Sequence, residues 1–140
     1  MVGIPPVHNA LEIRLLVADD QEMVRAGLRS MLGHRGIRIV AEASTGDDAI
    51  EAARSDEIDV ALIDIRMPGG DGLYALQRIK KIKADLPCLM LSTYDNAIYA
   101  DRSRALGAAG YIAKGTSGDK ILNAVRLVAA GYSLWLDGER

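Results

Sequence analysis

The sequence is poor in the residues that define several specialised classes of protein. It has a single cysteine in 140 residues, so no disulfide framework can form within the chain, and a reducing compartment such as the cytoplasm is expected. Cys88 opens an apolar run after Pro87, which favours a buried strand thiol over a nucleophile. No apolar stretch approaches the roughly 18 to 20 residues that span a membrane, and a signal peptide is not visible. A cytoplasmic globular protein is expected.

Aromatic residues and net charge are also scarce. The chain has no phenylalanine, one tryptophan and five tyrosines, yet 49% of its residues are hydrophobic, so aliphatic side chains and methionine must fill the core. A formal net charge of −2 argues against binding nucleic acid through bulk electrostatics. The length suits one domain, for which about 100 to 150 residues are typical.

Short apolar runs alternate with amphipathic segments of helical length. Strands are expected at residues 13–18, 37–43, 60–63, 89–91 and 111–113. Helices are expected at residues 21–32, after a cap at Ser44 or Thr45, at 73–83, at 96–106 and from Ser117 onward. Five β-then-α units with apolar strands favour an α/β fold, a flavodoxin-like (βα)5 doubly wound parallel sheet with strand order 2-1-3-4-5.

Polar side chains stand where the expected strands end. They are Asp19 and Asp20 after the first strand, Asp64 after the third, Ser92 and Thr93 after the fourth, and Lys114 after the fifth. Ligands bind outside the carboxyl ends of the strands in open α/β sheets, so these residues are expected to converge. Clustered carboxylates suit a hard cation such as Mg²⁺, a lysine suits a phosphate oxygen, and a carboxylate can act as a nucleophile. The pattern indicates phosphoryl transfer.

Each of these residues also has a plainer interpretation when it is taken alone. Asp20 could cap the next helix, and Asp64 could be a turn residue before the Pro- and Gly-rich loop at 66–72. Ser92 could satisfy backbone groups at a strand end, and Lys114 could simply be solvated. The functional interpretation is favoured because all of them fall on one edge of one sheet.

The motifs around these residues resemble the receiver domain of bacterial two-component response regulators, over residues 13–131. They are LVADD at 16–20, LIDIRMPGGDG at 62–72, MLSTYD at 90–95 and GYIAK at 110–114. The resemblance implies that Asp64 accepts a phosphoryl group from a sensor histidine kinase or a phosphotransfer protein. It also implies that Asp20, Asp64 and the backbone carbonyl of Arg66 hold Mg²⁺ directly, with Asp19 acting mainly through water. Such a domain would catalyse only its own phosphorylation and dephosphorylation.

The resemblance further implies a conformational switch. Ser92 would be drawn toward the phosphoryl group, Tyr111 would turn inward as an aromatic rotamer switch, and Lys114 would contact the phosphoryl group. Phosphorylation would then shift a two-state equilibrium. Two departures from the usual pattern are Gly115, where many receivers have a proline, and Arg66, which is expected to alter phosphate lifetime.

The end of the chain, from residue 124 through 137, resembles the segment that leads out of the receiver in LuxR/NarL-type transcription regulators. We expect a tail at 1–11, the receiver at 12–131 and the start of a linker at 132–140, before a helix-turn-helix effector domain absent from this sequence. Trp135 could also simply cover the end of the last helix. DNA would be bound only through that effector, a homodimer could form on phosphorylation, and no membrane contact is expected.

Three other functions are compatible with an α/β fold of this kind. A phosphatase with an aspartate nucleophile would need a second aspartate at the position of Arg66. A flavodoxin-type flavin domain would need a phosphate loop rich in Ser, Thr and Gly after the first strand, where this chain is acidic from Asp19 onward. A receiver-like scaffold that is never phosphorylated usually loses the acid pair, the acceptor or the lysine, all of which are present.

Overall fold

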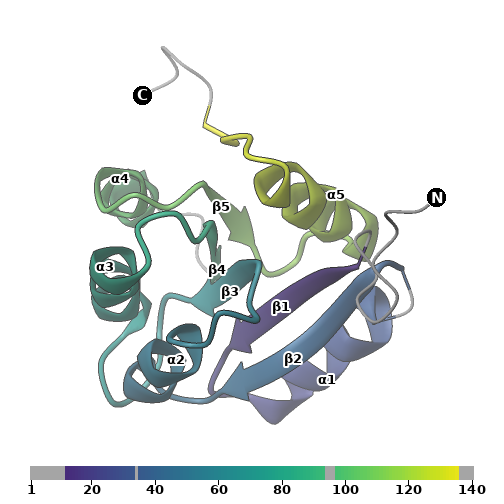
Figure 1. The fold of residues 1–140 in the computed structure, drawn as a ribbon, viewed down its shortest axis with the longest axis horizontal. Coiled ribbons are helices and arrows are strands. Elements are labelled where there is room, and N and C mark those ends of the chain that lie inside the picture. Colours follow the sequence, from purple (N-terminus) through teal and green to yellow (C-terminus); the bar gives the residue numbers. More distant parts are fainter. Residues whose placement is uncertain (1–11, 34, 94–96, 136–140) are drawn as a thin grey trace, which may run out of the picture.

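The computed structural model describes residues 12–33, 35–93 and 97–135. Within them, five strands alternate with five helices (Figure 1). The strands are β1 (Ile13–Ala18), β2 (Ile37–Ala43), β3 (Val60–Asp64), β4 (Cys88–Ser92) and β5 (Gly110–Ala113). The helices are α1 (Glu22–Leu32), α2 (Gly46–Ala53), α3 (Gly72–Ile82), α4 (Ala97–Ala105) and α5 (Gly118–Ala129). None of these helices is long and apolar enough to cross a membrane.

The strands form one parallel sheet in the order β2-β1-β3-β4-β5. The predicted fold class and strand order are therefore confirmed. The predicted bounds of β1 and β2 are correct, whereas β3 and β4 extend one residue further to include Asp64 and Ser92. The fourth helix was expected to start at residue 96, which lies outside the described residues, as do the tail at 1–11 and residues 136–140.

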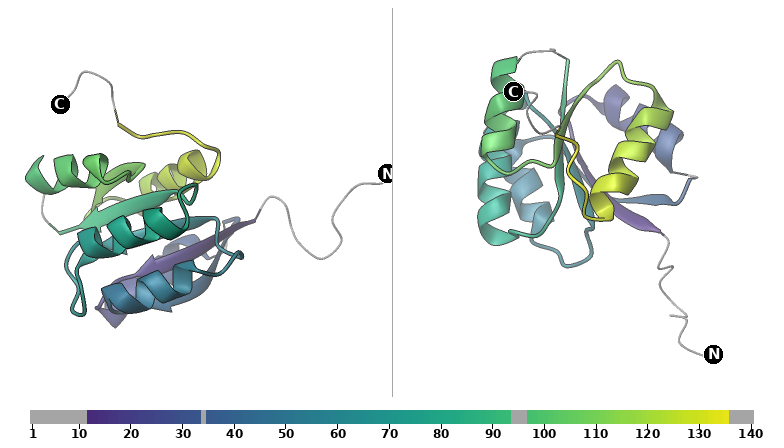
Figure 2. Two further views of the ribbon diagram at one scale, coloured as in Figure 1. Left: turned by 60° about the vertical axis from the view of Figure 1, so that its left-hand side comes forward. Right: turned by 90° about the horizontal axis from the view of Figure 1, so that it is seen from above.

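Helices cover both faces of the sheet, with α2, α3 and α4 on one side and α1 and α5 on the other (Figures 1 and 2). A hydrophobic core lies on each face of the sheet, and alternate residues of a strand belong to different cores because successive side chains point to opposite faces. In β1, Leu16 packs on the α2–α4 side, while Leu15 and Val17 pack on the α1–α5 side. Burial at every position explains why the central strands β3 and β4 are apolar up to their last residue, whereas the edge strand β2 carries Arg38 and Glu42 at exposed positions. Cys88 is a buried strand residue, as predicted.

Side-chain caps fix where three helices begin. The Thr45 hydroxyl accepts a hydrogen bond from the backbone N–H of Asp48 at 3.0 Å and starts α2, which decides between the two predicted caps. The carboxylate of Asp71 accepts from the N–H of Tyr74 at 2.9 Å and starts α3. The Ser117 hydroxyl accepts from the N–H of Lys120 at 3.3 Å and caps α5, which the sequence predicted to start near this residue. These caps satisfy N–H groups that have no partner within the helix.

The chain leaves α5 and returns to the sheet along the start of β5. The N–H of Leu134 donates to the carbonyl of Ala109 at 2.8 Å, and the Trp135 indole N–H donates to the carbonyl of Ala108 at 2.7 Å. The Arg104 guanidinium on α4 lies 5.7 Å from the centroid of a Trp135 ring. Trp135 therefore packs on the α2–α4 side of the sheet, and its interpretation as a cover for the end of α5 is wrong.

Candidate functional site

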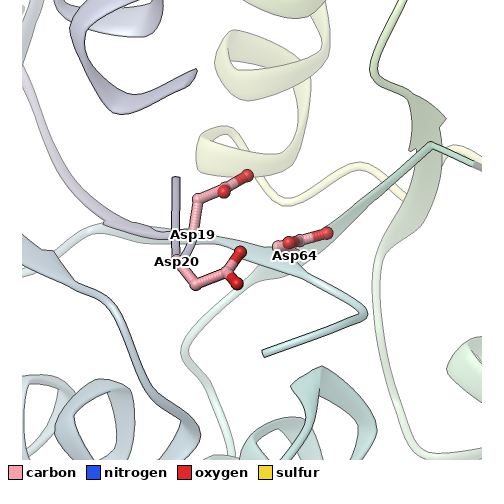
Figure 3. A group of neighbouring side chains, drawn as sticks. All are labelled: Asp19, Asp20 and Asp64. Carbon is pink, nitrogen blue, oxygen red and sulfur yellow. The ribbon is translucent and has the colours of Figure 1, made fainter. Parts of the chain in front are cut away.

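Three aspartates meet at the carboxyl ends of β1 and β3. Asp19 and Asp20 follow β1 and Asp64 is the last residue of β3, so the adjacency of these strands brings the acids together (Figure 3). One carboxylate oxygen from each lies within 4.8 Å of the others. Asp19 and Asp64 are buried, with 0% and 3% of their surface exposed, whereas Asp20 is exposed.

The turn after β1 directs the two neighbouring acids differently. Asp19 Oδ1 accepts a hydrogen bond from the N–H of Gln21 at 2.9 Å. Gln21 is the N-cap residue of α1 and makes no capping hydrogen bond with its side chain. The plainer interpretation of Asp20 as the helix cap is therefore wrong. Its carboxylate points toward Asp64 instead (Figure 3).

Lys114, which follows the edge strand β5, reaches this acid cluster across the carboxyl ends of the strands. Its Nζ lies 2.8 Å from Asp19 Oδ2 and 3.2 Å from Asp64 Oδ2. Burial lowers the pKa of Lys114, but the Asp19 and Asp64 carboxylates raise it by more, so the pKa lies above its ordinary value. The ammonium group therefore stays charged in a partly buried position.

The pKa of Asp64 is raised to about 6. Burial is the main cause, and repulsion from Asp19 adds to it. Attraction to Lys114 and a hydrogen bond from the backbone N–H of Arg66 act in the opposite direction without cancelling the rise. Three carboxylates thus face one lysine, and this excess of negative charge suits the binding of a cation.

A pocket of about 180 Å³ opens over Asp64. Its lining residues are Asp20, Gln21, Asp64, Arg66, Ser92, Thr93 and Lys114. Ser92 ends β4 and is 1% exposed, and its backbone carbonyl accepts a hydrogen bond from the N–H of Lys114 at 2.7 Å. The ends of β4 and β5 are thereby joined at the rim of the pocket. The polar residues at these strand ends therefore lie close together, as expected from the sequence.

The loop after β3 holds the Asp64 backbone firmly. A side chain on Gly72 would collide with the carbonyl of Asp64, so α3 begins directly against the end of β3. The φ angle of 86° at Gly70 is in the left-handed region that favours glycine. The N–H of Gly72 donates to the carbonyl of Ile65 at 2.7 Å and closes the loop. These constraints fix the direction in which the Asp64 side chain leaves the sheet.

Two further contacts near the site involve residues that the sequence did not single out as a pair. The guanidinium of Arg66 donates to the hydroxyl of Tyr99 on α4 at 3.0 Å and lies 5.9 Å from the centroid of that ring. Nothing in the local sequence marks Tyr99, because the contact joins residues 33 positions apart.

Tyr111, half-buried on β5, packs against the core on the α2–α4 side and does not line the pocket.

The chain is similar to known proteins both in sequence and in fold. The family model of the response regulator receiver domain matches residues 15–126. The response regulator UvrY of Escherichia coli K12 is 39% identical over 120 residues, which cover 85% of this chain and 55% of UvrY. The signal receiver domain of a NarL response regulator from Mycobacterium tuberculosis is 30% identical, with a TM-score of 0.81 over 86% of this chain and 98% of that one.

A response regulator from Burkholderia pseudomallei, whose structure contains a phosphorylated aspartic acid, a calcium ion and citrate, is 25% identical. Its TM-score is 0.74 over 85% of this chain and 69% of that one. The chain spans about half the length of the curated relatives it matches, since it covers 55% of UvrY. The family model, in contrast, covers most of the chain. The chain therefore belongs to the response regulator receiver domain family, and its relatives include NarL-type regulators.

Proposed function

We propose that this chain is a switch in which Asp64 accepts a phosphoryl group from a histidine kinase or a phosphotransfer protein. The proposal rests mainly on one observation: the Asp64 carboxylate sits at the floor of a pocket, 3.2 Å from the Lys114 ammonium and beside two further acids. This combination supplies a carboxylate nucleophile and a positive charge for the incoming phosphoryl oxygens.

The reaction that we propose is a direct transfer. A carboxylate oxygen of Asp64 attacks the phosphorus of a phosphohistidine, an O–P bond forms, and the N–P bond breaks with its electron pair remaining on the imidazole. The product on Asp64 is an acyl phosphate. Lys114 is close enough to Asp64 to pair with a phosphoryl oxygen after small side-chain motion. The domain would catalyse only its own phosphorylation and dephosphorylation. In dephosphorylation, water attacks the phosphorus of the acyl phosphate, the O–P bond to Asp64 breaks, and the carboxylate leaves with inorganic phosphate as the other product.

We further propose that the acid cluster holds Mg²⁺. Asp20, Asp64 and the backbone carbonyl of Arg66 would bind the ion directly, and Asp19 mainly through water. Their chemistry fits, because three carboxylates whose oxygens lie within 4.8 Å of one another make an all-oxygen site with excess negative charge. When bound, Mg²⁺ would neutralise charge on the transferring group. The response regulator from Burkholderia pseudomallei, whose structure contains a calcium ion and a phosphorylated aspartic acid, supports the presence of a divalent cation.

The switch itself would run through Ser92, Tyr111 and the segment between them. Ser92 is buried and lines the pocket, and its hydroxyl would be drawn toward a phosphoryl oxygen on Asp64 and donate a hydrogen bond to it. Tyr111 would then turn inward from its half-buried position on β5. The ends of β4 and β5 are hydrogen-bonded to each other, so a displacement of Ser92 would also displace the end of β5.

In this proposal the receiver spans residues 12–131, and residues 132–140 begin a linker. Output through a C-terminal helix-turn-helix domain, DNA binding and homodimer formation on phosphorylation are proposed from the NarL-type relatives. The cytoplasmic location expected from the sequence stays a prediction.

Labelling with a small phosphodonor tests the proposal. The purified chain is incubated with acetyl phosphate, with Mg²⁺ in one sample and with a chelator in the other, and its intact mass is measured. We expect the mass of one phosphoryl group to be added only in the sample with Mg²⁺. A chain that stays unlabelled in Mg²⁺, while a known receiver domain is labelled in parallel, would contradict it.

A further inference from the structure

We infer that Arg25 is a positioning residue for the metal-binding carboxylates, acting through the backbone that joins Asp19 to Asp20. The inference rests on the proposed function and deepens it. Arg25 lies on α1, and its guanidinium donates to the backbone carbonyl of Asp19 at 2.6 Å. That carbonyl belongs to the peptide group linking the two acids.

All three guanidinium nitrogens of Arg25 are occupied. Besides the contact with Asp19, Nε donates to Glu42 at 2.9 Å and the second terminal nitrogen donates to Glu22 at 2.7 Å. The side chain is only 16% exposed. Since a guanidinium is planar and its donors have a fixed geometry, these contacts hold the group in one orientation. The Asp19 carbonyl is therefore bonded to a donor that is itself immobilised.

The orientation of this peptide group matters most for Asp20. Within the described residues, no hydrogen bond holds the Asp20 carboxylate, so the backbone, which sets the direction of its Cα–Cβ bond, is what aims this side chain toward the site. The carboxylate of Asp19, by contrast, is fixed by Gln21 and Lys114. Groups that orient metal ligands without touching the metal strongly affect metal affinity, and Arg25 is placed to do so for Asp20.

The charge of Arg25 would have the opposite effect. A positive group close to a cation site disfavours cation binding, so removal of its charge alone should tighten Mg²⁺ binding. Removal of its positioning contact should weaken binding. A positioning role for Arg25 and an effect of its charge alone therefore predict changes in Mg²⁺ affinity of opposite sign.

Arg29 provides a matched control. Its guanidinium contacts the same two acids, Glu42 at 2.6 Å and Glu22 at 2.8 Å, but makes no described contact with Asp19. Arg29→Gln therefore removes one positive charge from the same ion-pair network and leaves the Asp19 carbonyl bonded. Arg25→Lys tests the complementary case, because it keeps the charge and loses the fixed three-way geometry.

The experiment is a Mg²⁺ titration of the full chain, followed by amide chemical shifts and by calorimetry, for the wild type, Arg25→Gln, Arg25→Lys and Arg29→Gln. We expect both Arg25 variants to bind Mg²⁺ about tenfold more weakly. Arg29→Gln should bind as tightly as the wild type or slightly tighter. In acetyl phosphate labelling, the Arg25 variants should need more Mg²⁺ for half-maximal rate but keep the rate at saturating Mg²⁺.

Failure of the inference is distinct from failure of the proposed function. If the wild type binds Mg²⁺ and both Arg25 variants bind equally well or better, Arg25 has no positioning role while the metal site stands. If the wild type itself does not bind, the metal site fails. Thermal unfolding is measured for each variant, and if Arg25→Gln is unfolded the milder Arg25→Lys decides, through its affinity and the shift of its Asp20 amide signal.

Discussion

The Lys114 ammonium lies 3.2 Å from the Asp64 carboxylate although their strands, β5 and β3, are not neighbours in the sheet. β4 lies between these two strands, and the same ammonium also lies 2.8 Å from Asp19, which follows β1 on the far side of β3. One cation thus bridges acids from two strands. It offsets part of their repulsion and leaves the site with a net negative charge.

Loss of this lysine should make Asp64 harder to ionise. Lys114 lowers the pKa of Asp64, which burial and Asp19 together raise to about 6. In the metal-free protein we expect Lys114→Gln to raise the pKa of Asp64 further, whereas Lys114→Arg should preserve most of the attraction. A pH titration of the Asp64 carboxyl carbon by NMR measures this. An unchanged pKa in Lys114→Gln would mean that the ion pair is absent in solution.

Asp64 should also cost the metal-free protein stability at neutral pH. Its folded-state pKa of about 6 exceeds the ordinary 3.8, so ionisation disfavours the folded state. The cost is absent below about pH 4, grows as the pH rises and is complete above about pH 6. Asp64→Asn should therefore increase the free energy of unfolding at pH 7.5, by at most about 3 kcal/mol. Loss of the Lys114 contact reduces this gain.

Urea unfolding of the wild type and Asp64→Asn, without metal, at pH 7.5 and at pH 4 gives the comparison. The stability difference between the two proteins should shift in favour of the wild type at the lower pH. A difference that is the same at both pH values would contradict the raised pKa. Mg²⁺ added at pH 7.5 should stabilise the wild type more than the variant, because the ion binds the folded state.

The two neighbouring acids should differ in their importance for metal binding. Asp20 is exposed and its carboxylate points toward Asp64, whereas the Asp19 carboxylate is tied to Gln21 and Lys114. We therefore expect Asp20→Asn to weaken Mg²⁺ binding far more than Asp19→Asn in a calorimetric titration. Asp19→Asn should instead lower the melting temperature, since it leaves Lys114 with one partner fewer in a buried position. Equal losses of Mg²⁺ affinity would contradict the direct and water-mediated roles.

Phosphorylation should be detectable at Trp135, the sole tryptophan of the chain. Its indole is bonded to Ala108 before β5 and lies against Arg104 on α4, the region that the switch is expected to move. We expect the tryptophan fluorescence and the hydrogen exchange of residues 97–114 to change on phosphorylation. Exchange in β2 and α2, on the opposite half of the sheet, should change little. A flat response across residues 97–114 would exclude this route.

The strands and their ends were open to prediction from the sequence because they depend on local patterns, and the strand order was expected as the one common for five β-then-α units. Apolar runs of strand length alternate with helices, and Asp64, Ser92 and Lys114 each follow such a run. The parallel sheet then brings their carboxyl ends to one edge. The convergence of these side chains could be predicted for this reason. The predicted strands were short by one residue at the end of β3, at the start of β5 and at each end of β4.

Contacts between distant side chains were not open to prediction in this way. Arg25 contacts the Asp19 carbonyl through a rotamer fixed by Glu42, which is on another strand. The hydrogen bond between Arg66 and Tyr99, and the return of Trp135 to β5, likewise depend on how the layers pack. Asp20 was a reasonable helix cap by residue type, but α1 begins at Glu22 with Gln21 in the cap position, so Asp20 lies one residue too early.

The identity of the phosphorylated residue is the most direct test of the account. Wild type, Asp64→Asn and Asp71→Asn are incubated with acetyl phosphate and Mg²⁺, and their intact masses are compared. Asp71 is an exposed aspartate in the same loop that caps α3, and asparagine can replace it as a cap, so this variant is the matched control. We expect one added phosphoryl group on the wild type and on Asp71→Asn, and none on Asp64→Asn. Full labelling of Asp64→Asn would contradict it.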